Sequence, residues 1–210
     1  MKYLFIYLFF ISTHLLAQHQ VVFEDEFRES FHTKPKFDVK LDNRFSFIRN
    51  NDVQTVGLKV GLNFNRKFKV GIGINQMLLP VEKKYYDENN VSIPVELDYA
   101  YVSPYLEYVY FNNKRWEFSL STQLGFGDAR YNVVTGSYET GDYNKKVLVK
   151  STMLSYEPAM LIDYKITKWI GIGTGVGYRF VFYKSPGVNE KFSSSAAILK
   201  LKIYLGQLVR

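Results

Sequence analysis

Apolar and polar residues alternate with a period of two along most of the chain after residue 36. The clearest case is residues 169–183, where one face is apolar and the other carries glycine or arginine. The first face holds Ile170, Ile172, Thr174, Val176, Tyr178, Phe180 and Phe182, and the second holds Gly171, Gly173, Gly175, Gly177 and Arg179. This is the side-chain period of a β-strand. The run is longer than a typical strand of a soluble sheet.

Seven other segments have the same period, and together they predict eight strands at residues 36–47, 53–64, 68–77, 97–111, 116–127, 148–164, 169–183 and 195–208. Turns of a few residues join the second strand to the third, the fourth to the fifth and the sixth to the seventh. Polar loops at residues 80–94, 131–146 and 184–191 join the other strands, apart from a short first connection. An even strand number with tight turns at one end and longer loops at the other is typical of bacterial outer-membrane barrels.

The sequence therefore predicts an all-β fold, an eight-stranded antiparallel up-and-down transmembrane β-barrel with short periplasmic turns and longer outer loops. The alternative fold is a soluble ligand-binding barrel of the lipocalin kind, which needs an apolar lumen and a polar exterior. The predicted strands have continuous aromatic and aliphatic faces opposite strongly charged faces, which disfavours a barrel with an apolar lumen and a polar exterior. The Gly-x-Trp typical of lipocalins is also missing from the first predicted strand.

Aromatic residues gather at the tight-turn ends of the predicted strands. Amphipathic rings prefer the boundary between membrane and water, so these positions predict an aromatic girdle. Its members are Phe64, Phe68, Tyr110, Phe111, Trp116, Tyr164 and Trp169.

The predicted inner face carries six acidic and seven basic side chains, which nearly cancel. An eight-stranded barrel is only wide enough for its side chains to fill, and an unpaired buried charge costs several kcal/mol. The sequence therefore predicts a lumen closed by a network of salt bridges. Its members are Asp38, Lys40, Asp42, Arg44, Lys59, Lys69, Glu107, Glu117, Glu157, Asp163, Arg179, Lys200 and Lys202.

The N-terminus predicts export. Lys2 precedes an apolar run at residues 3–11, and Ala17 is a suitable cleavage position, so residues 1–17 read as a secretory signal peptide. A short retained membrane anchor is the alternative. Residues 18–35 form a leader before the barrel of residues 36–210. The spacing of Phe23, Phe27 and Phe31 in this leader fits a short amphipathic helix, which would lie at the membrane interface or pack loosely.

Composition narrows the possible functions. The formal net charge is +7, but no basic helix is present and an exported protein does not meet nucleic acid, so no nucleic-acid partner is predicted. The chain has no cysteine, which excludes disulfides, zinc–thiolate sites and iron–sulfur clusters. No apolar run of about 18 residues follows the N-terminus, so a helical membrane protein is excluded.

No catalytic, cofactor-binding or metal-binding residues are predicted. The three histidines, His14, His19 and His32, all precede the barrel, so the barrel contains no side chain that ordinarily titrates near neutral pH. Glu107 and Glu157 could form an acid–base pair, but ion pairing inside the lumen is the simpler interpretation. The glycine series at residues 171–177 has the spacing GxGxGxG and not GxGxxG, so no nucleotide site is predicted.

The sequence segments at residues 156–164 and 169–178 resemble those of small Gram-negative outer-membrane barrels. These form the porin family, or outer-membrane β-barrel domain, typified by OmpX and the barrel of OmpA. The resemblance covers residues 36–210 and implies localisation in the outer membrane. One departure is the C-terminus, because Leu208, Val209 and Arg210 stand where these barrels usually end on an aromatic residue.

The resemblance describes a shape and leaves the activity open. We expect a non-enzymatic barrel that contacts outer-membrane lipid and serves envelope integrity, surface contact or adhesion through its loops, or a secretion machine as an accessory. The alternatives are a narrow channel and a lipid-modifying enzyme. Contact through the loops predicts that deleting residues 82–92 or 132–145 removes binding while the barrel still folds.

Overall fold

The structure, a computed structural model, describes residues 24–48, 51–86, 90–135 and 144–204. The predicted signal peptide lies outside these residues. A helix at residues 24–31 precedes the strands β1 (Lys36–Ile48), β2 (Asn51–Phe64), β3 (Phe68–Met77), β4 (Val81–Tyr86), β5 (Ser92–Asn112), β6 (Trp116–Thr135), β7 (Asn144–Lys165), β8 (Ile170–Lys184) and β9 (Ser194–Ile203). Within the described residues, no helix has the length and apolar character needed to span a membrane.

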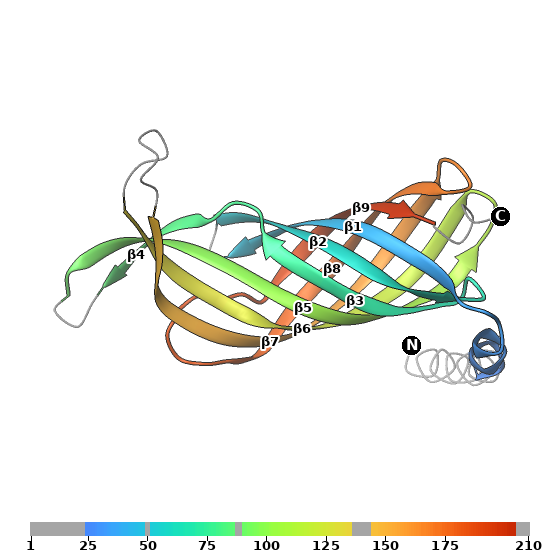
Figure 1. Ribbon diagram of the computed structural model, residues 1–210, viewed down its shortest axis with the longest axis horizontal. Coiled ribbons are helices and arrows are strands. Elements are labelled where there is room, and N and C mark those ends of the chain that lie inside the picture. Colours follow the sequence, from blue (N-terminus) through green and yellow to red (C-terminus); the bar gives the residue numbers. More distant parts are fainter. Residues whose placement is uncertain (1–23, 49–50, 87–89, 136–143, 205–210) are drawn as a thin grey trace, which may run out of the picture.

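Eight of these strands close into an antiparallel barrel (Figure 1). Neighbouring strands pair in the order β3-β2-β1-β9-β8-β7-β6-β5, and the pairing of β3 with β5 closes the ring. The ninth strand, β4, pairs with β5 beyond the ring and forms a hairpin with it. The predicted eight-stranded antiparallel barrel is therefore confirmed.

Tight turns close one end of the barrel, and the local sequence explains their geometry. Between β2 and β3, Asn65 and Arg66 have φ angles of 49° and 57°, the left-handed conformation of the central residues of a turn in which the Lys67 N–H donates to the Phe64 carbonyl at 2.9 Å. Between β5 and β6, the Asn113 Oδ1 accepts hydrogen bonds from the backbone N–H groups of Arg115 and Trp116 at 2.8 and 2.6 Å. These side-chain contacts satisfy backbone donors that no strand partner reaches.

At the other end, two predicted loops are wrong in part. The predicted loop at residues 80–94 contains β4 and the start of β5, which pair from Val81 with Leu97 to Tyr86 with Ser92. The predicted loop at residues 131–146 contains the end of β6 and the start of β7. Beyond the membrane both faces of a strand can meet water, so the apolar alternation that marks the barrel is lost there. β9 ends at Ile203, and the predicted strand residues 205–208 lie outside the described part.

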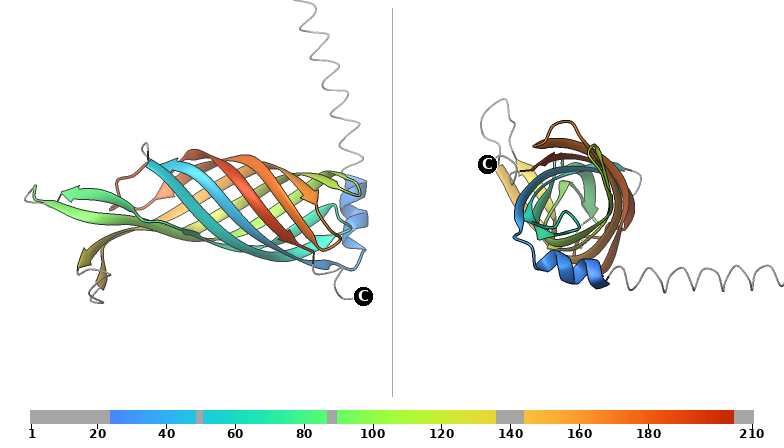
Figure 2. Two further views of the ribbon diagram at one scale, coloured as in Figure 1. Left: turned by 90° about the horizontal axis from the view of Figure 1, so that it is seen from above. Right: turned by 90° about the vertical axis from the view of Figure 1, so that its right-hand side faces the viewer.

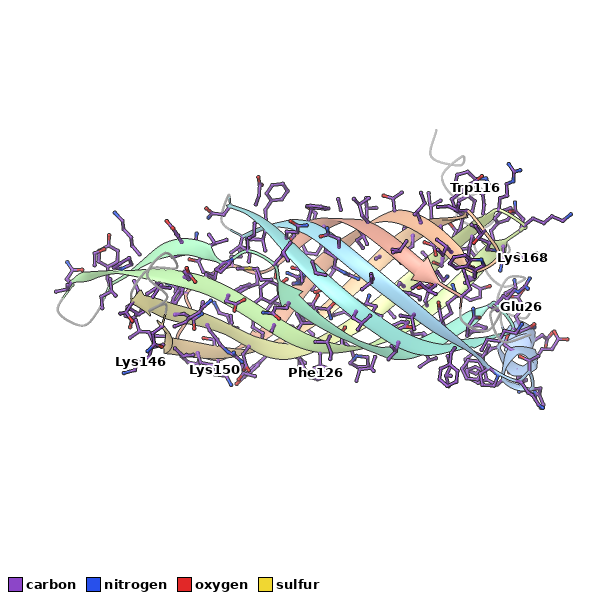
Figure 3. The ribbon with its side chains drawn as sticks, turned by 45° about the horizontal axis from the view of Figure 1, so that its top comes forward. Glu26, Trp116, Phe126, Lys146, Lys150 and Lys168 are labelled. Carbon is purple, nitrogen blue, oxygen red and sulfur yellow. The ribbon has the colours of Figure 1, made fainter. Side chains whose placement is uncertain are left out.

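The exterior of the barrel is apolar. Figure 3 shows Phe126 pointing away from the barrel wall, and its side chain is 50% exposed. Large apolar side chains on every strand of the ring share this orientation, among them Phe45, Leu58, Ile72, Leu106, Leu124, Met160, Val176, Phe180 and Leu199. A soluble barrel would expose polar residues here, whereas a barrel in a membrane needs an apolar band against lipid.

The helix at residues 24–31 lies across the tight-turn end of the barrel (Figure 2). Its Phe27 ring contacts Phe68 with centroids 5.2 Å apart, and its Phe31 ring contacts Phe64 at 4.6 Å. Beside these rings, the Glu26 carboxylate accepts hydrogen bonds from the Lys67 Nζ at 2.8 Å and the Tyr108 hydroxyl at 2.9 Å. The helix is therefore held to the outside of the wall by both apolar and polar contacts.

Candidate functional site

The lumen is the candidate site because it gathers nearly all the buried charge. All thirteen charged residues that the sequence predicts on the inner face are buried, none with more than 5% of its surface exposed. The strand period places them there, since alternate residues of each strand point inward. They divide into two clusters along the barrel axis, and apolar side chains fill the mouth beyond them.

The turn-side cluster lies nearest the tight turns and consists of Asp38, Lys40, Lys69, Glu107, Glu117, Asp163, Lys200 and Lys202. Glu107 contacts the ammonium groups of Lys40 and Lys69, each at 2.7 Å. Lys69 also contacts Glu117, which accepts a hydrogen bond from Lys202 at 2.6 Å. Asp163 continues the chain of contacts to Lys200 at 2.9 Å, and Asp38 lies 3.5 Å from Lys40. Four carboxylates and four ammonium groups thus balance exactly in number, without a net charge.

The mid-barrel cluster lies further from the turns and consists of Asp42, Arg44, Lys59, Glu157 and Arg179. Glu157 accepts hydrogen bonds from Arg44 at 2.7 Å and from Arg179. Asp42 contacts Lys59 at 2.6 Å and Arg44 at 3.3 Å. Two carboxylates therefore meet three cations, and this cluster has one positive charge in excess.

Aromatic rings face one of the three cations of the mid-barrel cluster. The Arg179 guanidinium carbon lies 5.0 Å from the centroid of the Tyr99 ring and 5.5 Å from that of Tyr101. Such a position stabilises a cation electrostatically, and the effect is larger in a desolvated site. The rings thus compensate in part for the missing carboxylate.

Three carboxylates of the turn-side cluster could in principle hold a metal ion. The oxygens of Glu107, Glu117 and Asp163 lie within 4.8 Å of one another. Lysine ammonium groups already approach each of these carboxylates, with Lys69 and Lys202 both contacting Glu117. The cations of the protein itself therefore take the positions that a metal would require.

Buried apolar side chains gather at the end of the barrel opposite the tight turns, which we call the outer mouth. Ile48, Leu97 and Tyr99 on the strands are each no more than 1% exposed. The segment between β8 and β9 returns into this mouth and places Val188 and Phe192 among them, both buried. The complete buried group is Ile48, Val53, Met77, Val95, Leu97, Tyr99, Tyr101, Ala129, Tyr131, Met153, Val188 and Phe192.

Hydrogen bonds fix the returning segment in place. The Val188 N–H donates to the Ser151 Oγ at 2.7 Å, and the Lys184 Nζ donates to the Glu190 carbonyl at 2.7 Å. Sequence reasoning missed the packing of this segment into the buried apolar group because residues 184–191 read as a polar loop. The available signal was the apolar pair Val188 and Phe192 on either side of Glu190.

The predicted girdle residues do not all face the surroundings. Trp116 and Trp169 are 43% and 45% exposed at the turn end, where Figure 3 shows Trp116. Tyr110 and Phe111 are similarly exposed, and Tyr164 packs against Trp116 with ring centroids 4.9 Å apart. These five residues lie at the tight-turn end, and their role as an aromatic girdle stays a prediction.

The two remaining girdle residues, Phe64 and Phe68, are covered by the helix at residues 24–31. Phe68 is only 1% exposed, and Phe64 is half-buried. The prediction that Phe68 faces the membrane boundary is therefore wrong. The helix occupies the surface that lipid or water would otherwise contact.

Of the three histidines, the described part of the chain contains His32. It follows the helix, and its Nδ1 lies 2.7 Å from the Arg28 carbonyl oxygen. The candidate carboxylates Glu107 and Glu157 each contact two cations in the lumen. The structure does not bring His32 to these carboxylates, since it contacts the helix outside the wall.

No family model matches the sequence, and no curated protein is significantly similar to it. Among solved structures, the fold is similar to that of Neisserial surface protein A, with a TM-score of 0.55 and 10% identity over 81% of this chain and 96% of the other. The N-terminal barrel of Pseudomonas aeruginosa OprF has a TM-score of 0.42 and 10% identity over 81% of this chain and 98% of the other. The attachment invasion locus protein Ail of Yersinia pestis has a TM-score of 0.43 and 13% identity over 81% of this chain and 96% of the other.

At 10% identity, the similarity to the Neisserial protein establishes the fold alone. The predicted resemblance to small outer-membrane barrels is confirmed at that level. A closed barrel is one of the two structures that can span a bilayer, and bacterial outer membranes are where barrels with an apolar exterior and tight turns at one end occur. The chain is therefore a barrel of the cell outer membrane.

Proposed function

We propose that the protein is a closed, non-enzymatic barrel that displays a contact surface outside the cell. The observation that carries this proposal is a contrast at the outer mouth. Val188 and Phe192 help to fill the lumen there, while β5, β6 and β7 continue beyond the ring. A chain that seals its own pore and extends its strands past it is suited to contact and not to transport.

The extended strands form a surface of defined shape. β3 stops pairing with β5 at Gln76 and Ala100, yet β5 extends outward to Ser92 and pairs with β4 on the way. β6 and β7 remain paired as far as Thr135 and Asn144. Figure 1 shows the two pairs diverging beyond the barrel. Hydrogen-bonded strands present side chains in fixed positions, which lowers the entropy cost of binding a partner.

The side chains on this surface are amphipathic. Glu82, Lys84 and Tyr86 are exposed on β4, and Tyr86 is 57% exposed. A mixture of charge with tyrosine suits recognition of a protein surface, because tyrosine supplies apolar area together with a hydroxyl donor. We propose that the partner is a protein or another component of the envelope or of a contacted surface.

A non-enzymatic role is supported by the state of the lumen carboxylates. Each lumen Glu and Asp lies within 4.0 Å of at least one Lys or Arg nitrogen. A general acid or base must reach a substrate, whereas these groups are enclosed and tied to cations. The supported role of the charge is to close and stabilise the barrel.

Planar-bilayer recording tests the closed lumen. The purified, refolded barrel should insert without producing reproducible conductance steps, and a sucrose-loaded vesicle should not release its content. Steady steps of uniform size would overturn the closed-barrel proposal in favour of a narrow channel. Altered lipid A or phospholipid in cells that express the protein would favour the enzyme.

The contact surface is tested with the variant E82S/K84S/Y86S, displayed on a Gram-negative host that lacks its own adhesins. Its matched control is L58V/I72V/I74V, which alters the lipid-facing wall and leaves the hairpin intact. We expect autoaggregation or adherence to matrix-coated plates with the wild type and the control, and loss of it with the hairpin variant. Equal adherence by all three would overturn the assignment of contact to β4.

A further inference from the structure

A cavity of about 800 Å³ opens at the tight-turn end of the barrel, on the opposite side from the proposed contact surface. The three tight turns, the start of β1 and the residue after β9 surround it. We call it the turn-end basin. Its lining residues are Lys36, Phe37, Asn63, Arg66, Asn112, Asn113, Lys114, Arg115, Glu117, Lys165, Ile166, Thr167, Lys168 and Tyr204.

The charge of the turn-end basin is strongly unbalanced. Its basic residues are Lys36, Arg66, Lys114, Arg115, Lys165 and Lys168, against the single carboxylate of Glu117. That carboxylate is already shared by Lys69 and Lys202 of the turn-side cluster. Among the described residues, none of the six basic side chains forms a salt bridge.

Neutral groups at the basin add hydrogen-bonding capacity. The Tyr204 hydroxyl is buried and has no hydrogen-bond partner in the described part of the chain. Buried polar groups are normally satisfied, so an unpartnered hydroxyl donor beside a cavity points to a bound species.

A phosphate-bearing ligand matches these features best. Phosphate oxygens accept hydrogen bonds from guanidinium, ammonium, amide and hydroxyl donors, and ion pairing strengthens the bonds to the cations. The cavity is much larger than one phosphate, and its cations come from four separate segments of the chain. These facts favour a ligand with several negative charges.

We propose that the turn-end basin binds a multiply charged, phosphate-bearing ligand at the periplasmic face of the outer membrane. Two sources supply this chemistry, the headgroup of an anionic phospholipid of the inner leaflet and a soluble oligophosphate. Both would lie against the same turns, so the experiment must separate them.

The test uses the full refolded chain in a non-ionic detergent at low salt, titrated with inorganic triphosphate in a calorimeter. The test variant is K114Q/R115Q/K168Q, which removes three basin cations. The matched control is K84Q/K146Q/K191Q, which removes three exposed cations from the outer end; Figure 3 shows Lys146 there and Lys168 at the turn end. Heat-modified mobility in SDS establishes that each variant is folded.

We expect triphosphate affinity to fall at least about tenfold in the basin variant and less than about twofold in the control, because charge-assisted contacts are lost only at the basin. Equal loss in both variants would show general charge attraction and overturn the site. Tighter binding of citrate than of triphosphate would overturn the phosphate class. Should the triple variant not fold, Y204F provides the second test, with a smaller loss of affinity expected from one donor.

The source is distinguished in nanodiscs of phosphatidylcholine with and without cardiolipin, using native mass spectrometry to detect retained lipid. Cardiolipin retained by the wild type and the control but lost from the basin variant identifies the headgroup as the ligand. Triphosphate binding unchanged by cardiolipin identifies a soluble ligand. If the wild type neither retained cardiolipin nor bound triphosphate, the proposal would be overturned.

Discussion

The guanidinium of Arg44 and the carboxylate of Glu157 lie 113 residues apart in the sequence and meet inside the barrel, with 2.7 Å between Nη1 and Oε2. Glu157 also contacts Arg179 and accepts a hydrogen bond from the Gln123 side chain at 2.8 Å. One carboxylate thus joins β1, β6, β7 and β8 across the lumen. Its removal leaves two guanidinium groups without their main counter-charge.

We therefore expect Glu157→Ala to lower the free energy of unfolding by about 3–5 kcal/mol, the usual cost of breaking a buried ion pair. Glu157→Gln should cost nearly as much, because it keeps the shape and removes the charge. The measurement is urea unfolding of the barrel in lipid vesicles, followed by tryptophan fluorescence.

The control for this prediction is Asp128→Ala. Asp128 lies 3.0 Å from Lys150, whose side chain is 54% exposed, so the pair is screened by water. We expect a loss below about 1 kcal/mol at this exposed pair. Wild-type stability in Glu157→Gln would show that the lumen tolerates an uncompensated guanidinium pair, contrary to this account.

The helix at residues 24–31 should be removable from the barrel wall without unfolding the barrel. Phe27→Ala with Phe31→Ala removes the ring contacts to Phe68 and Phe64. Aromatic pairs contribute about 0.5–1.5 kcal/mol each beyond the area they bury, enough to detach a short helix. We expect faster proteolysis within residues 24–35 and an unchanged heat-modified shift in SDS.

Phe37→Ala is the control for the helix prediction, since Phe37 follows the helix on β1 and is 69% exposed. Its substitution should leave proteolysis of the helix at the wild-type rate. Loss of the heat-modified shift in the double variant would mean that the helix is required for the barrel itself.

Gly71 should resist replacement because the Val60 carbonyl and the Tyr105 ring lie against it. A Cβ atom at this position would lie 2.2 Å from the Val60 carbonyl oxygen and 2.8 Å from the Tyr105 ring. Backbone cannot move aside at low cost, so Gly71→Ala should destabilise the barrel by about 1–3 kcal/mol, as overpacking commonly does. Vesicle unfolding in urea measures the difference.

Gly171→Ala is the matched control, because the nearest atom to its added Cβ is the Tyr164 carbonyl oxygen at 3.1 Å. A small adjustment accommodates that contact, so we expect less than half the loss seen at Gly71. Equal losses at the two positions would point to glycine's backbone properties in general and not to the close approach of Val60 and Tyr105.

The strand period was sufficient to place Lys40, Asp42 and Arg44 on one face of β1, because inward and outward positions alternate whatever the strand pairs with. It could not identify their partners. The contact of Arg44 with Glu157 depends on how the ring closes, and that closure is a property of all eight strands together. Local alternation carries no information on distances across a lumen.

The sequence-based predictions are wrong where the membrane does not impose an alternation of apolar and polar residues. The sequence of β4 predicts a loop, because polar residues occur on both of its faces outside the ring. Phe68 has the parity of a lipid-facing residue, but the rings of Phe27 and Phe31 from a separate segment pack on it, and it is buried. In the same way, Phe192 enters the mouth from a connection that lacks any strand period.

Substitution of Phe192 tests whether the apolar mouth and the charged clusters of the lumen act separately. Phe192→Ala removes a fully buried ring beside Tyr99, with ring centroids 5.7 Å apart, and should cost about 3–5 kcal/mol. The charged clusters below it remain intact, so we expect the barrel to stay closed to ions in planar bilayers. Phe182→Ala, at a position 60% exposed on the outer wall, is the control for changes in membrane insertion. Steady conductance in Phe192→Ala alone would show that the apolar mouth is the sole barrier, and that the salt-bridged lumen beneath it admits ions.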